Sequence, residues 1–139
     1  AHLTRRYLED LPNLRLTLDI SHWCNVAESL LEDQEEAVAL AIARTDHVHA
    51  RVGFAQGPQI IDPRSPAWAA DLERHLSWWE QIALRMRKEG RARMTVTVEF
   101  GPVPYTVVHP ESQKPIVEQW EANQAIRQIV AERLAPLVE

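Results

Sequence analysis

The chain of 139 residues contains 15 lysine and arginine residues against 20 aspartate and glutamate residues, which gives a formal net charge of −5. This acidic balance disfavours nucleic acid as a partner, because proteins that bind a phosphate backbone present basic surfaces. With 45% hydrophobic and 25% charged residues, the composition is typical of a globular chain that buries one core. We therefore expect residues 1–139 to form a single domain, or part of one.

The cysteine content and the hydropathy pattern argue against secretion and against a membrane partner. The single cysteine, Cys24, has no second cysteine with which to form an internal disulfide. No stretch approaches the roughly 18 consecutive apolar residues of a membrane span, and a signal-peptide pattern is absent. We expect a cytoplasmic protein. Because the sequence begins at Ala1 with residues that resemble the middle of a helix, we also expect a fragment of a longer protein.

Helical and extended patterns alternate along the first half of the chain. A stripe of apolar residues predicts a first helix that stops at Pro12, and residues 14–20 predict a strand. A segment rich in Glu and Ala predicts a helix from about residue 26 to 44. Residues 46–53 then predict a second, short strand.

The second half repeats this order. Ser65 as the N-cap and Pro66 at the first helical position predict a helix that runs to Gly90. A third strand is predicted at residues 93–100 and a closing helix from about 116 to 134. We expect the closing helix to place the following residues in the core: Ile116, Trp120, Ile126, Ile129 and Val130. Helices of ten or more residues between strands imply parallel pairing, so the sequence predicts an α/β fold.

Each predicted strand has one polar face, because successive side chains point to opposite sides of a sheet. The polar faces carry Thr17 and Asp19 in the first strand, His47, His49 and Arg51 in the second, and Thr95, Thr97 and Glu99 in the third. A parallel sheet covered on both sides would instead have continuous apolar strands. Ionisable residues gathered toward the strand ends predict a closed barrel with a wet upper interior, and Asp19 would face its mouth.

Three of these polar residues form a candidate metal site. Asp19, His49 and Glu99 occupy matching positions near the ends of successive strands, and their oxygen and nitrogen atoms suit Mn²⁺, Mg²⁺, Co²⁺ or Zn²⁺. Each residue also has a structural alternative: a helix cap, a packed imidazole and a salt-bridge partner of an arginine, respectively. If the three bind one ion, we expect their side-chain tips to lie within about 7 Å of one another.

Three segments resemble the xylose-isomerase-like TIM barrels, a family that includes sugar phosphate isomerases/epimerases and ketose 3-epimerases. These segments are "DISH" at residues 19–22, "HVHARVG" at 47–53 and "EFGPVPY" at 99–105. The resemblance covers nearly the whole chain, but only the C-terminal half of the family's fold. It implies the C-terminal half of a (β/α)8 TIM barrel, in which parallel strands alternate with helices and the first of four metal ligands, a glutamate, lies upstream of Ala1.

The resemblance also implies an activity, that of a divalent-metal-dependent isomerase or epimerase. Its substrate would be a sugar or sugar phosphate, and protons would be transferred through an enediolate. Asp19, His49 and Glu99 would hold the metal, and Glu99 would also be the catalytic acid and base. His22 would contact the substrate. Arg51 would neutralise a substrate oxyanion or phosphate, or would instead form a structural salt bridge.

Two other functions stay open at this point. A metal-dependent phosphodiesterase of the endonuclease IV type shares the barrel, although the acidic charge disfavours DNA binding. A non-catalytic or truncated barrel would retain the motifs without turnover. As a fragment, the chain would lack one metal ligand and one of two acid/base glutamates. We therefore expect it to be inactive in isolation and to associate with the missing N-terminal half-barrel or with another copy of itself through its open strand edges.

Overall fold

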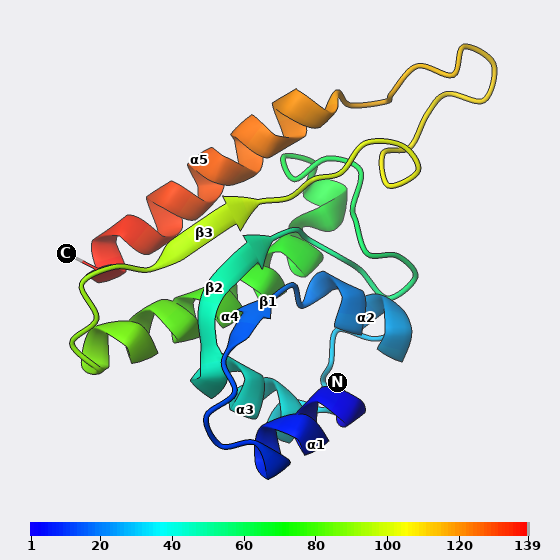
Figure 1. Cartoon of the computed structure of the whole chain (residues 1–139). Helices are drawn as coiled ribbons and strands as arrows, with labels where there is room; N and C mark the ends of the chain where they lie inside the picture. Colours follow the sequence, from blue (N-terminus) through cyan, green and yellow to red (C-terminus); the bar gives the residue numbers. More distant parts are fainter. Residues whose placement is uncertain (139) are drawn as a thin grey trace.

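A three-stranded parallel sheet with helices packed against it forms the centre of the computed structural model, which describes residues 1–138 (Figure 1). In chain order the elements are α1 (His2–Asp10), β1 (Leu16–Leu18), α2 (Ser21–Ala27), α3 (Glu35–Arg44), β2 (Thr45–Ala50), the 3-10 helix η1 (Pro66–Trp68), α4 (Ala69–Lys88), β3 (Thr95–Val98) and α5 (Gln119–Val138). The predicted α/β class is confirmed, whereas a half-barrel stays a prediction. No helix within residues 1–138 is long and apolar enough to cross a membrane.

The strands lie in the order β1-β2-β3, and both neighbouring pairs are parallel. His47 of β2 pairs with Thr17 on one side and with Thr95 on the other, and His49 pairs with Thr97. All three strands therefore end at the same edge of the sheet. The loop between β3 and α5 extends beyond this edge (Figure 1).

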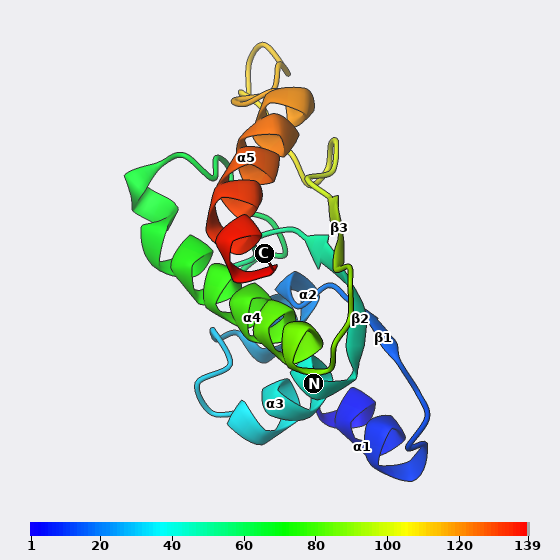
Figure 2. The ribbon, with the colours of Figure 1, turned by 90° about the vertical axis from the view of Figure 1, so that its left-hand side faces the viewer.

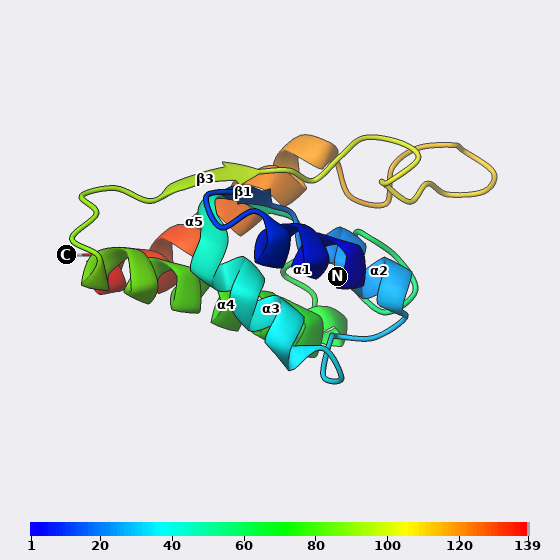
Figure 3. The same ribbon diagram turned by 60° about the horizontal axis from the view of Figure 1, so that its bottom comes forward.

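The helices cover one side of the sheet and leave the polar side open (Figures 2 and 3). The buried strand-region residues face the helices and include Leu18, Val48, Ala50, Val52 and Phe100. On the opposite side Thr17, Thr95 and Thr97 are exposed, and His47 and His49 are half-buried. The predicted alternation between an apolar and a polar face is confirmed.

Helix α4 supplies the largest side chains of the core. Trp78 and Trp79 are both almost fully buried, as are Leu76, Ile82 and Met86 on the same helix. Burying an apolar side chain of this size stabilises the fold by about 1.5–3 kcal/mol relative to leaving it exposed. The helix ends near the predicted stop at Gly90, whose φ of 71° lets the N–H of Arg91 donate to the carbonyl oxygen of Met86 over 3.0 Å.

The single helix predicted over residues 26–44 is wrong, because α2 and α3 replace it and a turn separates them. Glu28 and Leu31 adopt positive φ angles of 52° and 62°, which no α-helix accommodates. The Leu31 side chain is fully buried, and its N–H donates to Ser29 Oγ over 3.1 Å. Core packing and this side-chain turn outweigh helix propensity here. Helix α2 begins before the predicted helix, at Ser21, and His22 lies in its first turn.

The start of the closing helix also differs from the expectation. Helix α5 begins at Gln119, and Ile116 and Trp120 are 44% and 73% exposed rather than buried. The core contacts of α5 recur every four residues, at Ala122, Ile126, Val130 and Leu134. This spacing places one face of the helix against α4 and the sheet and turns Trp120 outward.

His75 joins α4 to the segment that follows β2. The side chain is fully buried; its Nδ1 donates to the carbonyl oxygen of Asp71 over 2.8 Å, and its Nε2 accepts from the N–H of Gly53 over 3.2 Å. The rings of Trp78 and Trp79 pack against it. Because burial disfavours the charged imidazolium, the pKa of His75 falls to about 4.

Acidification should therefore destabilise the fold through His75. In the unfolded chain this imidazole regains a pKa near 6.5, so between about pH 6.5 and 4 the unfolded state binds more protons and the free energy of unfolding falls as the pH falls. We expect this group to contribute a loss of roughly 2 kcal/mol between pH 7.5 and pH 5. Urea unfolding of the wild type and of His75→Gln, which retains an amide donor and acceptor but does not titrate, measures the difference. Equal pH dependence in both proteins would contradict the assignment.

Candidate metal centre

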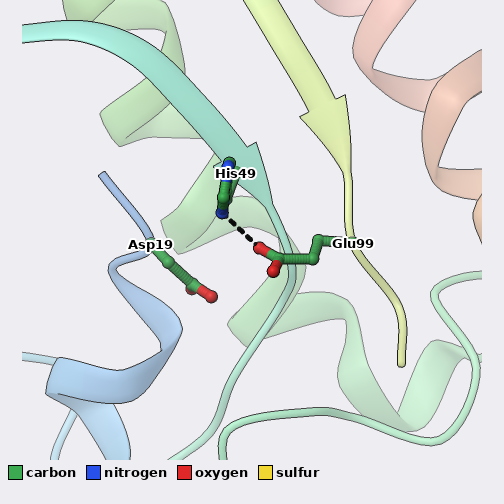
Figure 4. Close-up of side chains that lie close together, drawn as sticks. All are labelled: Asp19, His49 and Glu99. Atoms are coloured by element: carbon green, nitrogen blue, oxygen red, sulfur yellow. Dashed lines mark ion pairs between the residues drawn. The ribbon is translucent and has the colours of Figure 1, made fainter. Parts of the chain in front are cut away.

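Asp19, His49 and Glu99 lie together at the C-terminal edge of the sheet (Figure 4). Asp19 follows β1, His49 is the penultimate residue of β2, and Glu99 follows β3. One ligand atom from each residue lies within 4.8 Å of the other two. Because two ligands of one ion at about 2.2 Å are at most roughly 4.4 Å apart, small side-chain movements would suffice for coordination. The structure thus brings the three predicted ligands together, while metal binding stays a prediction.

The closest contact in the site joins His49 and Glu99, whose Nδ1 and Oε2 atoms are 2.5 Å apart. This is an ion-pair distance, but the geometry is not that of a hydrogen bond, and the buried Oε2 atom has no hydrogen-bond donor. A buried carboxylate oxygen without a donor is unfavourable. A cation bound by the carboxylate would satisfy this oxygen, and so would a proton on the facing imidazole nitrogen, so metal binding stays a prediction.

Asp19 uses its two carboxylate oxygens differently. Oδ1 accepts hydrogen bonds from the Ser21 N–H at 3.1 Å and from Ser21 Oγ at 2.5 Å, which ties the carboxylate to the start of α2. Oδ2 faces His22 Nε2 at 3.4 Å and Arg51 Nη2 at 3.6 Å. The N-cap of α2 is Ile20, so Asp19 is not the helix cap considered from the sequence, and its second oxygen is directed toward the candidate site.

Arg51 lies against both carboxylates. Its Nη2 is 3.1 Å from Glu99 Oε1 and 3.6 Å from Asp19 Oδ2, and its Nε donates to the backbone oxygen of Glu99 over 3.0 Å. The ring of Tyr105 covers the guanidinium at 4.5 Å, and only 6% of the side chain is exposed. These contacts are those of the salt-bridge alternative. Substrate binding by Arg51 stays a prediction, and the small exposed area does not favour it.

His22 occupies the rim of the site. Its side chain is 47% exposed, and its Nε2 approaches Asp19 Oδ2 at 3.4 Å. The first turn of α2 thus holds the imidazole beside the three predicted ligands, with half of its surface free. This position is compatible with the predicted substrate contact.

The sequence did not indicate that two loop residues, Gln59 and Tyr105, support the site. Gln59 Oε1 accepts from the Gly101 N–H over 2.7 Å and fixes the chain just after Glu99. A side chain at position 101 would collide with Tyr105, because a Cβ there would be 2.8 Å from the Tyr105 ring. Gly101 therefore lets Tyr105 fold back over Arg51. Only the glycine, at the end of a predicted strand, was a sequence signal for this close approach.

Comparison of the sequence with protein-family models gave no match, and neither did comparison of the chain with curated proteins or with solved structures. The resemblance to xylose-isomerase-like barrels therefore stays an expectation.

Gly53 controls how closely the segment after β2 approaches the start of α2. A Cβ at this position would lie 2.7 Å from the Ser21 carbonyl oxygen and 2.9 Å from the Ser21 Cα. Because backbone atoms must then separate, we expect Gly53→Ala to lower the free energy of unfolding by about 1–3 kcal/mol. Urea unfolding measures the loss.

The matched control is Gly57→Ala, where the added methyl group meets only the Phe54 ring, which can move. We expect this variant to lose less stability than Gly53→Ala. An equal or smaller loss in Gly53→Ala would contradict the close approach.

Proposed function

We propose that this chain supplies metal ligands and a proton-transferring glutamate to a divalent-metal-dependent isomerase or epimerase of sugars or sugar phosphates. One observation carries the proposal: Asp19, His49 and Glu99 converge from the ends of three adjacent parallel strands. Active sites of α/β enzymes lie at the carboxyl ends of parallel strands.

The donor set suits a hard or borderline divalent ion. Two carboxylates and one imidazole are ligands for Mn²⁺, Mg²⁺, Co²⁺ or Zn²⁺, and their ligand atoms lie within 4.8 Å of one another. Thiolate ligation is disfavoured, because burial raises the pKa of Cys24 to about 12 and keeps it a thiol. A bound ion would polarise the carbonyl of a hydroxyketone and make the adjacent C–H acidic.

Glu99 is the residue to which we assign proton transfer. Its carboxylate would take the proton from the carbon beside the substrate carbonyl, which gives an enediolate. Return of the proton to the former carbonyl carbon, with transfer of the hydroxyl proton to the former carbonyl oxygen, gives the isomer. An epimer instead requires delivery of a proton to the opposite face of the original carbon by a second acid. His22, exposed at the rim, would donate a hydrogen bond to a substrate oxygen.

The open side of the sheet supports a barrel as the setting of this chemistry. The helices cover one side only, and the polar side carries the candidate ligands (Figure 2). We propose that a second half-barrel, from another chain segment or another copy, completes this side and supplies the missing acid/base group.

A phosphodiesterase is less well supported, because Arg51, the cation in contact with both carboxylates, is 6% exposed and the net charge is −5.

Metal binding is the first test. Isothermal titration should show one Mn²⁺ bound per wild-type chain. Asp19→Asn and His49→Ala should each lower the affinity by about tenfold or more, since each removes a ligand. His22→Ala should leave the affinity unchanged, because its proposed role is contact with substrate.

Asp46→Asn is the matched carboxylate control for this titration. Asp46 also belongs to β2, at its N-terminal end, where it pairs with Arg15 and Arg91. An affinity equally reduced by Asp46→Asn, or a wild type that binds no Mn²⁺, would contradict the site. Loss in His22→Ala equal to that in Asp19→Asn would make His22 a ligand.

Proton exchange tests the chemistry separately from net turnover. With saturating Mn²⁺ in D2O, the chain should introduce deuterium beside the carbonyl of a ketose or ketose phosphate, even without a second acid/base group. At matched metal occupancy, Glu99→Gln should lower this exchange rate by about 100-fold. NMR and mass spectrometry follow the label. If the metal-loaded wild type exchanges no faster than free Mn²⁺, the non-catalytic alternative is correct.

A further inference from the structure

Arg51 occupies an unusual place relative to the candidate ligands. The same guanidinium nitrogen, Nη2, lies 3.1 Å from Glu99 Oε1 and 3.6 Å from Asp19 Oδ2. The arginine therefore bridges two carboxylates that come from different strands. Its Nε also binds the Glu99 backbone, which fixes the guanidinium relative to the end of β3.

The surroundings of Arg51 keep its charge effective. The side chain is 6% exposed, with the Tyr105 ring 4.5 Å from the guanidinium carbon. Gln59 holds the start of the loop that carries Tyr105 through its hydrogen bond to Gly101. Because little water reaches Arg51, its interactions with nearby charges are screened less than those of a surface arginine.

A cation in this position acts on the site in two opposed ways. Asp19 and Glu99 would repel each other without a positive charge between them, so Arg51 favours the assembled arrangement before any metal binds. The same charge repels a divalent ion, and it occupies Asp19 Oδ2, the Asp19 oxygen that is directed toward the candidate site. The arginine thus stabilises the arrangement of the carboxylates in the metal-free protein and lowers the affinity of the site for a metal ion.

We propose that Arg51 is a positioning residue: an internal counter-cation that holds Asp19 and Glu99 together in the metal-free protein and weakens metal binding, so that the ion is readily exchangeable. This role rests on the proposed metal centre and differs from direct substrate binding. It predicts that loss of the positive charge raises metal affinity while it lowers stability without metal.

Arg51→Met tests the proposal, because methionine is a flexible side chain that can fill the space under Tyr105 without a charge. We expect its Mn²⁺ affinity to rise by about tenfold or more in isothermal titration. In EDTA its melting temperature should be lower than that of the wild type, and the increase in melting temperature on adding Mn²⁺ should be larger. Arg51→Lys, which keeps the charge, should bind Mn²⁺ nearly as the wild type does.

Two further variants complete the experiment. Arg64→Met removes an arginine from an exposed pair with Asp62, which is not a candidate ligand. It should therefore leave the Mn²⁺ affinity and the metal-free stability of the site unchanged. Tyr105→Ala leaves Arg51 in place but exposes it to water, and should also raise Mn²⁺ affinity. This variant carries the same test if Arg51→Met does not fold.

The outcomes separate the two proposals. A wild type without Mn²⁺ binding overturns the metal centre itself and the role of Arg51 with it. A wild type that binds Mn²⁺, together with equal or weaker binding in Arg51→Met, overturns only the counter-cation role. If Arg51→Met does not fold, equal or weaker binding in Tyr105→Ala overturns that role.

Discussion

Parallel pairing of β1, β2 and β3 is the constraint on which the candidate site depends. The register that pairs His49 with Thr97 brings the ends of β2 and β3 level, and the pairing of Thr17 with His47 does the same for β1. Every second side chain of each strand then faces the open side of the sheet, because successive side chains point to opposite sides. A shift of one residue would turn His49 toward the helices and replace it with Ala50 or Val48. The apolar side chains of the strands are buried under α3, α4 and α5, and exposing them would oppose such a shift.

Charge balance decides how the converging side chains are held. The site brings two carboxylates within reach of one imidazole and one guanidinium, and none of these groups lies on the apolar side of the sheet. Ser21 fixes one oxygen of Asp19, while Arg51 contacts the other and also reaches Glu99. The buried neutral His75 anchors the loop after β2 from the opposite side. The positions of the candidate ligands are thus set by hydrogen bonds and ion pairs that do not require a metal.

The alternation of faces along each strand and the approximate places of the strands could be predicted from the sequence, because period-two alternation and helix-length spacers are local patterns. Asp19, His49 and Glu99 were found in this way. The predicted strands extended past the observed ends, which lie at Leu18, Ala50 and Val98. The turn at Glu28 and Leu31 could not, since it depends on burial of Leu31 in a core that only the folded chain creates. Trp120 was predicted in the core for a similar reason, because an apolar side chain does not by itself show which surface, if any, covers it. The environment of Arg51 was also hidden, because the cover formed by Tyr105 comes from a loop without periodicity.

The central claim is that His49, together with Asp19 and Glu99, ligates one divalent ion. Electron spin-echo spectroscopy of the Mn²⁺-loaded chain tests it most directly, because a coordinated imidazole nitrogen modulates the echo of the bound ion. We predict nitrogen modulation in the wild type that changes on labelling histidine with ¹⁵N, persists in His22→Ala and disappears in His49→Ala at full Mn²⁺ occupancy. Bound Mn²⁺ without nitrogen modulation, or modulation that survives His49→Ala, would contradict the account.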